Sequence, residues 1–237
     1  MMTRTTTAYL TAEQWREHAG AFTRAVTVTC CGKRENSRWS PPPDTGARAA
    51  LRAGVRKPVQ AFPIAAHRVI FGAAQRYGPE AAREAWANGR VDPERERAYY
   101  TVAALIADQA RDARDRQAEG EGDEKAGSLG ISLAALDEHQ TYDVTTPRES
   151  DLSLMAKQSL EGIHTLLPDV IRQLRSRERP VPIDWAQLIV DLSAWTGRRE
   201  EITKRWNQDY YRQRHANGRA LLDSARPTGD DFQGDEN

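Results

Sequence analysis

The stretch IDWAQLIVDLSAW, Ile183–Trp195, decides the fold class of this 237-residue chain. Asp184 stands where a helix cap would stand, and apolar residues follow it at the spacing of one helix face. A stripe this wide predicts a helix that buries one side in a helical bundle. We interpret four residues of the stretch, together with one tryptophan downstream, as structural core: Trp185, Leu188, Leu192, Trp195 and Trp206.

Helical patterns also dominate on both sides of this stretch, and no segment alternates convincingly with a period of two. The sequence therefore predicts an all-α fold. We expect helices at residues 11–25, 45–54, 64–76, 79–89, 93–116, 132–138, 148–162, 165–177, 184–195 and 198–217. Pro168 should lie in the first turn of its helix or kink it, because proline donates no backbone hydrogen bond.

The segments between these helices predict a two-lobed helical protein. An N-terminal helical lobe, residues 1–118, contains an irregular connector at 26–44, where three consecutive prolines exclude a helix and 26–30 could form a short strand. An acidic, glycine-rich flexible loop at 119–130 precedes a C-terminal helical bundle at 131–222. The composition of residues 223–237 is typical of a disordered acidic tail.

The formal net charge is zero, with 34 basic and 34 acidic residues, but the charges are segregated. Residues 1–118 carry a surplus of seven positive charges and residues 152–222 a surplus of four, whereas 119–151 and 223–237 are acidic. This segregation favours a polyanionic partner, although solvated helix faces would also produce it. Arginine makes up 29 of the cations and suits phosphate oxygens, but a codon bias would give the same excess.

A window without carboxylates gives the strongest pointer to nucleic acid. Residues 45–79 contain no Asp or Glu but hold six cations: Arg48, Arg52, Arg56, Lys57, Arg68 and Arg76. Arg48, Arg52 and Arg56 lie four residues apart, which predicts a ridge along one short helix. A surface that faces phosphates gains by excluding like charge.

Two further arginine rows follow in the second half. One helix is expected to carry Arg198, Arg205 and Arg212 at a spacing of seven, flanked by Arg199 and Lys204, and the other Arg172, Arg175 and Arg179. Aligned rows on neighbouring helices can follow a sugar–phosphate backbone. They can equally be solvated faces, or pair with Glu200 and Glu201.

Motifs of known catalytic, phosphate-loop and metal sites are absent, and the five histidines are scattered one per segment. We therefore expect no catalytic residue, metal or cofactor, although Cys30 and Cys31, if they lie in a loop, could be reactive. No apolar run is long enough to span a membrane, and the first residues lack the apolar region of a signal peptide. We expect a cytoplasmic protein that is not an enzyme.

Four stretches resemble the CasB family, the small subunit of the type I-E CRISPR Cascade complex. The closing segment Leu166–Arg212 resembles its signature of a leucine-rich helix, a DW…W helix and a basic helix that ends in paired aromatics. GISL from Gly130 resembles the family's entry to its second half. GARAALRAG from Gly46 and YYTVAALIADQ from Tyr99 resemble two helices of its first half.

The resemblance implies a two-lobed helical protein of which two copies lie along the Cascade complex. Members contact the backbone and large subunits, and they stabilise the hybrid of crRNA and target DNA and the displaced DNA strand. Phosphate contact carries over to matching positions, which are Arg48, Arg52, Arg172, Arg175, Arg198, Arg199, Lys204 and Arg205. The charge of the acid-free window adds Arg56 and Lys57.

Together these features predict a non-catalytic, sequence-independent nucleic-acid-binding subunit that stabilises an R-loop in antiviral defence and has no membrane partner. Two alternatives remain open. One is a structural scaffold that contacts only protein, and the other is a stand-alone helical DNA-binding regulator.

Overall fold

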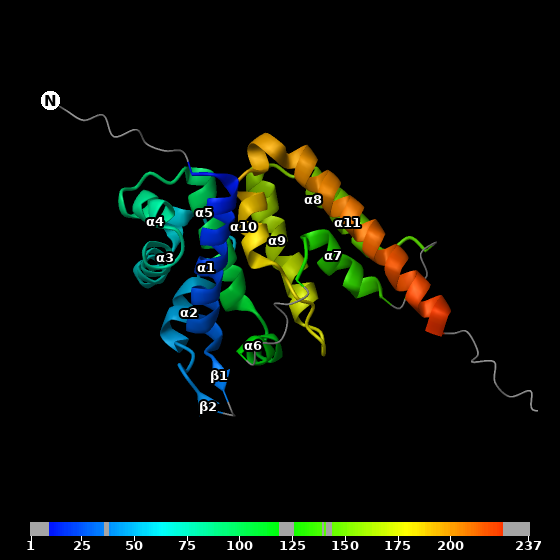
Figure 1. Cartoon of the computed structure of the whole chain (residues 1–237), viewed down its shortest axis with the longest axis horizontal. Helices are drawn as coiled ribbons and strands as arrows, with labels where there is room; N and C mark the ends of the chain where they lie inside the picture. Colours follow the sequence, from blue (N-terminus) through cyan, green and yellow to red (C-terminus); the bar gives the residue numbers. More distant parts are fainter. Residues whose placement is uncertain (1–9, 36–37, 119–125, 139, 141–143, 225–237) are drawn as a thin grey trace, which may run out of the picture.

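The computed structural model describes residues 10–35, 38–118, 126–138, 140 and 144–224. Within them the chain is all-α, as predicted, and its β-structure is one antiparallel pair, β1 (Arg34–Glu35) and β2 (Arg38–Trp39). Figure 1 shows the helices: α1 Ala12–Cys31, α2 Thr45–Arg52, α3 Ile64–Arg76, α4 Glu80–Ala87, α5 Pro93–Asp108, α6 Arg111–Ala118, α7 Leu129–Ala134, α8 Pro147–Ala156, α9 Leu160–Arg175, α10 Trp185–Leu192 and α11 Trp195–Ser224. Short 3-10 turns lie at Val59–Ala61 and Ala135–Asp137.

Helix α1 begins where predicted but continues beyond its predicted end. Thr11 and Gln14 form a capping box, in which each side chain accepts a hydrogen bond from the other residue's backbone N–H. The predicted end at residue 25 and the possible strand at 26–30 are wrong. Phe22, Val26 and Cys30 are fully buried at a spacing of four, so one helix face continues to the last turn. The β1–β2 pair then occupies part of the predicted irregular connector.

Helix α5 is the central helix of the first half. Its residues from Ala98 to Ala107 are buried almost without interruption, and it packs against α1, α2 and α10. The predicted single helix 93–116 is wrong because the backbone becomes extended at Gln109, where ψ is 147°. The Gln109 side chain turns back to donate to the carbonyl of Ile106 at 3.0 Å, and α6 starts two residues later.

The boundary between α8 and α9 also differs from the prediction. Ser159 caps α9 by accepting a hydrogen bond from the N–H of Gly162 at 3.2 Å, so α9 begins five residues before the predicted start. As a result Pro168 lies inside α9 and not in its first turn.

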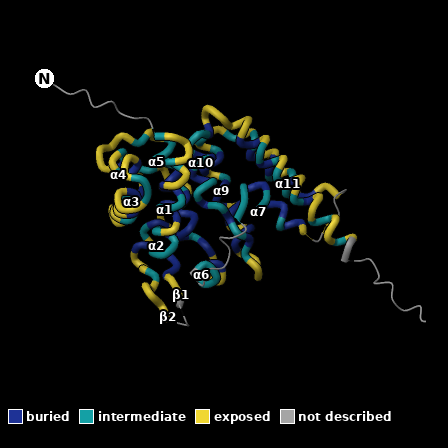
Figure 2. Tube along the Cα trace, viewed as in Figure 1, coloured by how far each residue is buried: buried dark blue, intermediate teal, exposed yellow. Residues whose placement is uncertain are grey.

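One hydrophobic core runs through both halves of the described chain (Figure 2). Helix α10 packs against α1 and α5, and Arg16 of α1 donates to Asp184 at 2.9 Å. All five residues interpreted as core are buried: Trp185, Leu188, Leu192, Trp195 and Trp206. The two-lobe division stays a prediction, and residues 119–125 of its dividing loop lie outside the described residues. Helix α11 continues to Ser224, and residues 225–237 of the predicted tail also lie outside.

The packing of α7 on α11 explains the glycine of the GISL stretch. A side chain at Gly130 would overlap the backbone carbonyl of Trp206, so only glycine permits this close crossing. The same two helices are joined by Ser128, which donates to Asp209 at 2.7 Å. The crossing therefore holds α11 in place, and α11 carries one of the arginine rows.

Candidate nucleic-acid interface

Arginines from α2 and α9 meet at two shared carboxylates. Arg52 on α2 donates to Asp108 at 2.8 Å, and Arg172 on α9 reaches the same carboxylate at 3.2 Å. Arg172 also bonds Asp169 at 3.0 Å, and Arg56 pairs with Asp169 as well. We call these five residues the α2–α9 cluster. With three cations and two anions it keeps a net positive charge, and its three arginines remain exposed.

The expected ridge of Arg48, Arg52 and Arg56 along one helix is wrong in its last member. Helix α2 ends at Arg52, and Arg56 has a left-handed backbone with φ of 63°. Gly54 lies in the turn between them, and the Phe62 ring occupies the space that a side chain at this position would need. Arg56 therefore points to α9, and this brings the acid-free window and the α9 row together.

Arg48 and Lys57 lie on either side of Arg52 and carry no ion pair within the described part of the chain. Arg48 is half-buried near the end of α1, and Lys57 is exposed. Cys30 and Cys31 end α1 and are buried free thiols, so their predicted loop position is wrong. Burial raises the pKa of Cys30 to about 12 and that of Cys31 to about 11, which keeps both thiols protonated and unreactive.

Arg175 is an interior residue, which contradicts its predicted contact with phosphate. It is 7% exposed, and its guanidinium donates to the Gln109 side chain and to the carbonyls of Val181 and Ala113. These bonds tie α9 to the break between α5 and α6. The spacing of three and four residues in the row Arg172, Arg175 and Arg179 did not reveal this, because the covering segments are distant in sequence.

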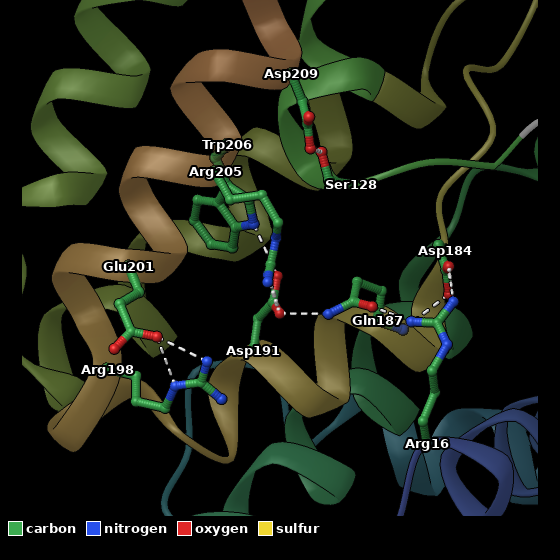
Figure 3. Close-up of polar contacts among 10 residues, drawn as sticks. All are labelled: Arg16, Ser128, Asp184, Gln187, Asp191, Arg198, Glu201, Arg205, Trp206 and Asp209. Atoms are coloured by element: carbon green, nitrogen blue, oxygen red, sulfur yellow. Dashed lines mark hydrogen bonds and ion pairs between the residues drawn. The ribbon is translucent and has the colours of Figure 1, made fainter. Parts of the chain in front are cut away.

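The second set of cations lies at the start of α11. Arg198 donates to Glu201 at 2.7 Å, and Arg199 donates to the carbonyl of Gln158 at 3.2 Å (Figure 3 shows the first pair). Lys204 is exposed, without an ion pair among the described residues. Farther along, Arg212 pairs with Asp209 at 2.8 Å. Helix α11 thus offers an exposed basic face that its own carboxylates partly neutralise.

Arg205 has a structural partner that the sequence did not indicate. Asp191 of α10 is 2% exposed and accepts hydrogen bonds from Gln187 at 2.6 Å and from the Trp206 indole at 2.8 Å, and Arg205 also pairs with it (Figure 3). Burial raises the pKa of the Asp191 carboxyl, while Arg205 acts in the opposite direction. We call these four residues the Asp191 network. It fixes α11 on α10, and Arg205 still exposes part of its guanidinium.

The two basic regions lie toward opposite ends of α9. Its first end meets α11, where the Trp195 indole donates to the carbonyl of Gln158 at 3.2 Å. Arg172 is twelve residues beyond Leu160, or about 18 Å along the helix axis. Between them Glu161 pairs with Arg97 at 2.6 Å. The structure therefore joins the α2 and α9 rows directly, and the α11 row lies about three helical turns away.

Two buried histidines, His18 and His164, have structural roles. His18 bonds Tyr99 at 2.6 Å and the carbonyl of Ala74 at 2.8 Å, and His164 bonds Thr101 at 2.8 Å. Burial lowers the pKa of both, that of His164 to about 3. Among the described residues there is no group of metal-binding side chains, and none of the helices there has the length and apolar composition of a membrane span.

Comparison with known proteins identifies the family. The model of "CRISPR-associated protein Cse2" matches residues 47–211. A chain of a solved "CRISPR RNA-guided surveillance complex" is 31% identical, with a TM-score of 0.62, over 90% of this chain and 99% of its own. A chain of the "pre-nicking" form of such a complex is also 31% identical, with a TM-score of 0.64, over 89% and 99%. No curated protein sequence matches.

The crystal structure of M. ruber CasB shares the fold, with 20% identity and a TM-score of 0.58 over 86% of this chain and 97% of that one. The sequence-based resemblance to CasB is thereby confirmed. Since the family model spans well over half of the residues, the chain belongs to the Cse2 (CasB) family.

Proposed function

We propose that this chain is a non-catalytic small subunit of a type I-E CRISPR surveillance complex and stabilises the R-loop. It contacts the crRNA–target DNA hybrid and the displaced strand through their backbones, without reading sequence. Its protein partners are the backbone and large subunits and a second copy of itself. Exchanging a DNA duplex for an RNA–DNA duplex is nearly balanced in energy, so contacts to the loose strand decide the outcome.

The α2–α9 cluster carries this proposal. It gathers three exposed arginines from two distant segments of the chain, and its two carboxylates leave a surplus of positive charge. Arg48 and Lys57 extend the cluster with charges that no described carboxylate neutralises. Phosphate oxygens compete well for such arginines, because a guanidinium binds them bidentately.

The same ion pairs also favour a second candidate, a scaffold that contacts only protein. Arg52, Arg56, Arg172 and Arg198 each already have a carboxylate partner. If these pairs persist in the complex, the arginines serve only to stabilise the fold of the chain. The two functions differ in what the unpaired cations do.

The test changes cations whose removal breaks no ion pair. Single-stranded DNA affinity of the full chain is measured by fluorescence anisotropy over a salt series. About five phosphate contacts give a slope of log affinity against log salt near −3.5. Arg48→Ala/Lys204→Ala removes one cation from each basic region and is expected to bring the slope to about −2.

The matched control is Arg90→Ala/Arg177→Ala, which removes two exposed cations outside both basic regions. It should leave the slope unchanged. Equal slopes for the test and control variants, or an affinity that does not depend on salt, would overturn nucleic-acid contact and favour the scaffold. A strong preference for one duplex sequence would instead favour a stand-alone regulator.

A further inference from the structure

A basic groove outside the two regions described above lies between α1, the start of α2 and α3. Its arginines are Arg24 on α1 and Arg68 and Arg76 on α3, all exposed. None of the three has an ion pair with a described residue, so their charges are not neutralised within this part of the chain. Figure 1 shows α1, α2 and α3 together at one end of the molecule.

The floor of the groove is apolar, and over Gly72 it leaves an open space, which we call the gap. Val28 and Ala25 of α1 and Val69 and Ala73 of α3 line it, and a side chain added at Gly72 would meet nothing within 4 Å. Asp44 is the carboxylate among the described lining residues, and it is engaged in capping α2 through the N–H of Ala47 at 2.9 Å. The groove therefore presents cations around an open apolar site.

The cations are spaced along one face of α3. Arg68, Gly72 and Arg76 follow one another at intervals of four residues, so the two arginines are about 12 Å apart along the axis with the gap between them. Tyr77, 44% exposed, closes the same end as Arg76. A ligand that fits has an apolar group between two anionic groups about this far apart.

The last residues of the chain have this pattern. In GDDFQGDEN, residues 229–237, Phe232 stands between an acidic pair at 230–231 and a second at 235–236. In an extended chain Asp231 and Asp235 are about 13 Å apart, which matches the spacing of Arg68 and Arg76. The segment holds four carboxylates for the three arginines of the groove.

The occupant is better supplied by another molecule than by the same chain. Helix α11 ends at Ser224 on the far side of the molecule from α3 (Figure 1). Asp230 is only six residues farther on, a reach of at most about 21 Å. A second copy is not held at this distance and can bring its own segment 229–237 to the groove.

We infer that the groove of Arg24, Arg68 and Arg76 binds the acidic C-terminal segment, residues 229–237, of a second copy of this chain. Phe232 enters the gap over Gly72, and the acidic pairs bind the arginines on either side. This inference rests on the part of the proposed function that places two copies side by side. Because the contact is head to tail, it joins copies in a row and does not close a symmetric pair.

Binding is tested with a labelled peptide of residues 226–237 and the full chain, in the absence of nucleic acid. We expect salt-sensitive binding that falls at least tenfold in Arg68→Glu/Arg76→Glu. Gly72→Leu fills the gap without changing any charge and should also weaken the peptide at least tenfold. The charge control Arg90→Glu/Arg177→Glu should bind like the unchanged protein.

Two further measurements separate this contact from general charge attraction and from the proposed function. A scrambled peptide of the same composition should bind at least tenfold more weakly, and Phe232→Ala should reduce concentration-dependent self-association in sedimentation. Single-stranded DNA affinity should be unchanged in Gly72→Leu.

Three outcomes would each overturn the inference. They are undiminished peptide binding by Gly72→Leu, equal binding of the scrambled peptide, and loss of DNA affinity without any peptide binding. The last result would assign the groove to nucleic acid.

Discussion

The α2–α9 cluster and the Asp191 network use the same chemistry in opposite surroundings. Both join different helices through arginine and aspartate. In the network the carboxylate is 2% exposed and also holds the Trp206 indole. In the cluster the Asp169 side chain is 50% exposed and bonds only arginines.

This difference in burial distinguishes a carboxylate that holds helices together from one that a nucleic acid can displace. A buried carboxylate is out of reach of a phosphate, and removing it leaves its donors unsatisfied in the interior. An exposed carboxylate holds arginines in place weakly, so a polyanion can displace it. The comparison therefore assigns Arg205 largely to holding α11, and it supports the proposed ligand contact for Arg56 and Arg172, which share the exposed carboxylate of Asp169.

The largest expected effect is on the buried side. Asp191→Ala leaves the buried Trp206 indole N–H without its acceptor and Arg205 without its partner. We expect a loss of about 3 kcal/mol in the free energy of unfolding, measured by urea denaturation. The control is Glu201→Ala, which breaks the exposed pair with Arg198 and should cost less than about 0.5 kcal/mol. Similar losses for both variants would contradict the comparison.

Lowering the pH tests the buried side of this comparison, because it favours protonation of the buried His164 and so places a positive charge in the interior. Burial lowers the pKa of His164 to about 3, against 6.5 for an ordinary histidine, with Arg97 and Glu161 as its charged neighbours. The folded state therefore binds fewer protons than the unfolded state between these values, and stability falls as the pH is lowered below 6.5. At pH 5 the loss from this group is about 2 kcal/mol.

The measurement compares unfolding at pH 7 and pH 5 for the unchanged chain and for His164→Asn, whose side-chain oxygen can still bond Thr101. The variant should be less sensitive to acid by about 2 kcal/mol. An identical pH dependence in the two proteins would show that His164 is not a buried neutral group.

Local patterns explain how much of this could be predicted from the sequence. The stripe of α10 and the cap of α1 depend on residues within a few positions of one another, and both were predicted. The closing signature likewise led to the correct family, because its residues lie within one continuous segment. Regular spacing on one element is visible in a sequence.

What failed depends on which other segments pack against a residue and on where a helix ends. Arg175 fits an exposed row by spacing, but α6 and the loop after α9 cover it. Arg205 fits another row, but its partner Asp191 belongs to the preceding helix. Arg56 left its predicted ridge because α2 ends at Arg52 and the backbone at Arg56 is left-handed. Spacing predicts which residues share a face, and it does not show what covers that face.

The smallest expected effect is in the exposed α2–α9 cluster, where removal of a carboxylate should raise the affinity for DNA and leave stability almost unchanged. Asp169→Asn keeps the shape of the side chain in the α2–α9 cluster but removes a charge that Arg56 and Arg172 now share. Stability should change by less than about 1 kcal/mol, because exposed pairs contribute little. Affinity for single-stranded DNA should rise about threefold, since one negative charge some 7 Å from a phosphate costs about 0.6 kcal/mol in water.

The control is Glu84→Gln, which removes an exposed carboxylate on α4 and should leave the affinity unchanged. A fall in affinity for Asp169→Asn would mean that the carboxylate positions the arginines for the phosphate, and the cluster would then resemble the Asp191 network more than burial indicates.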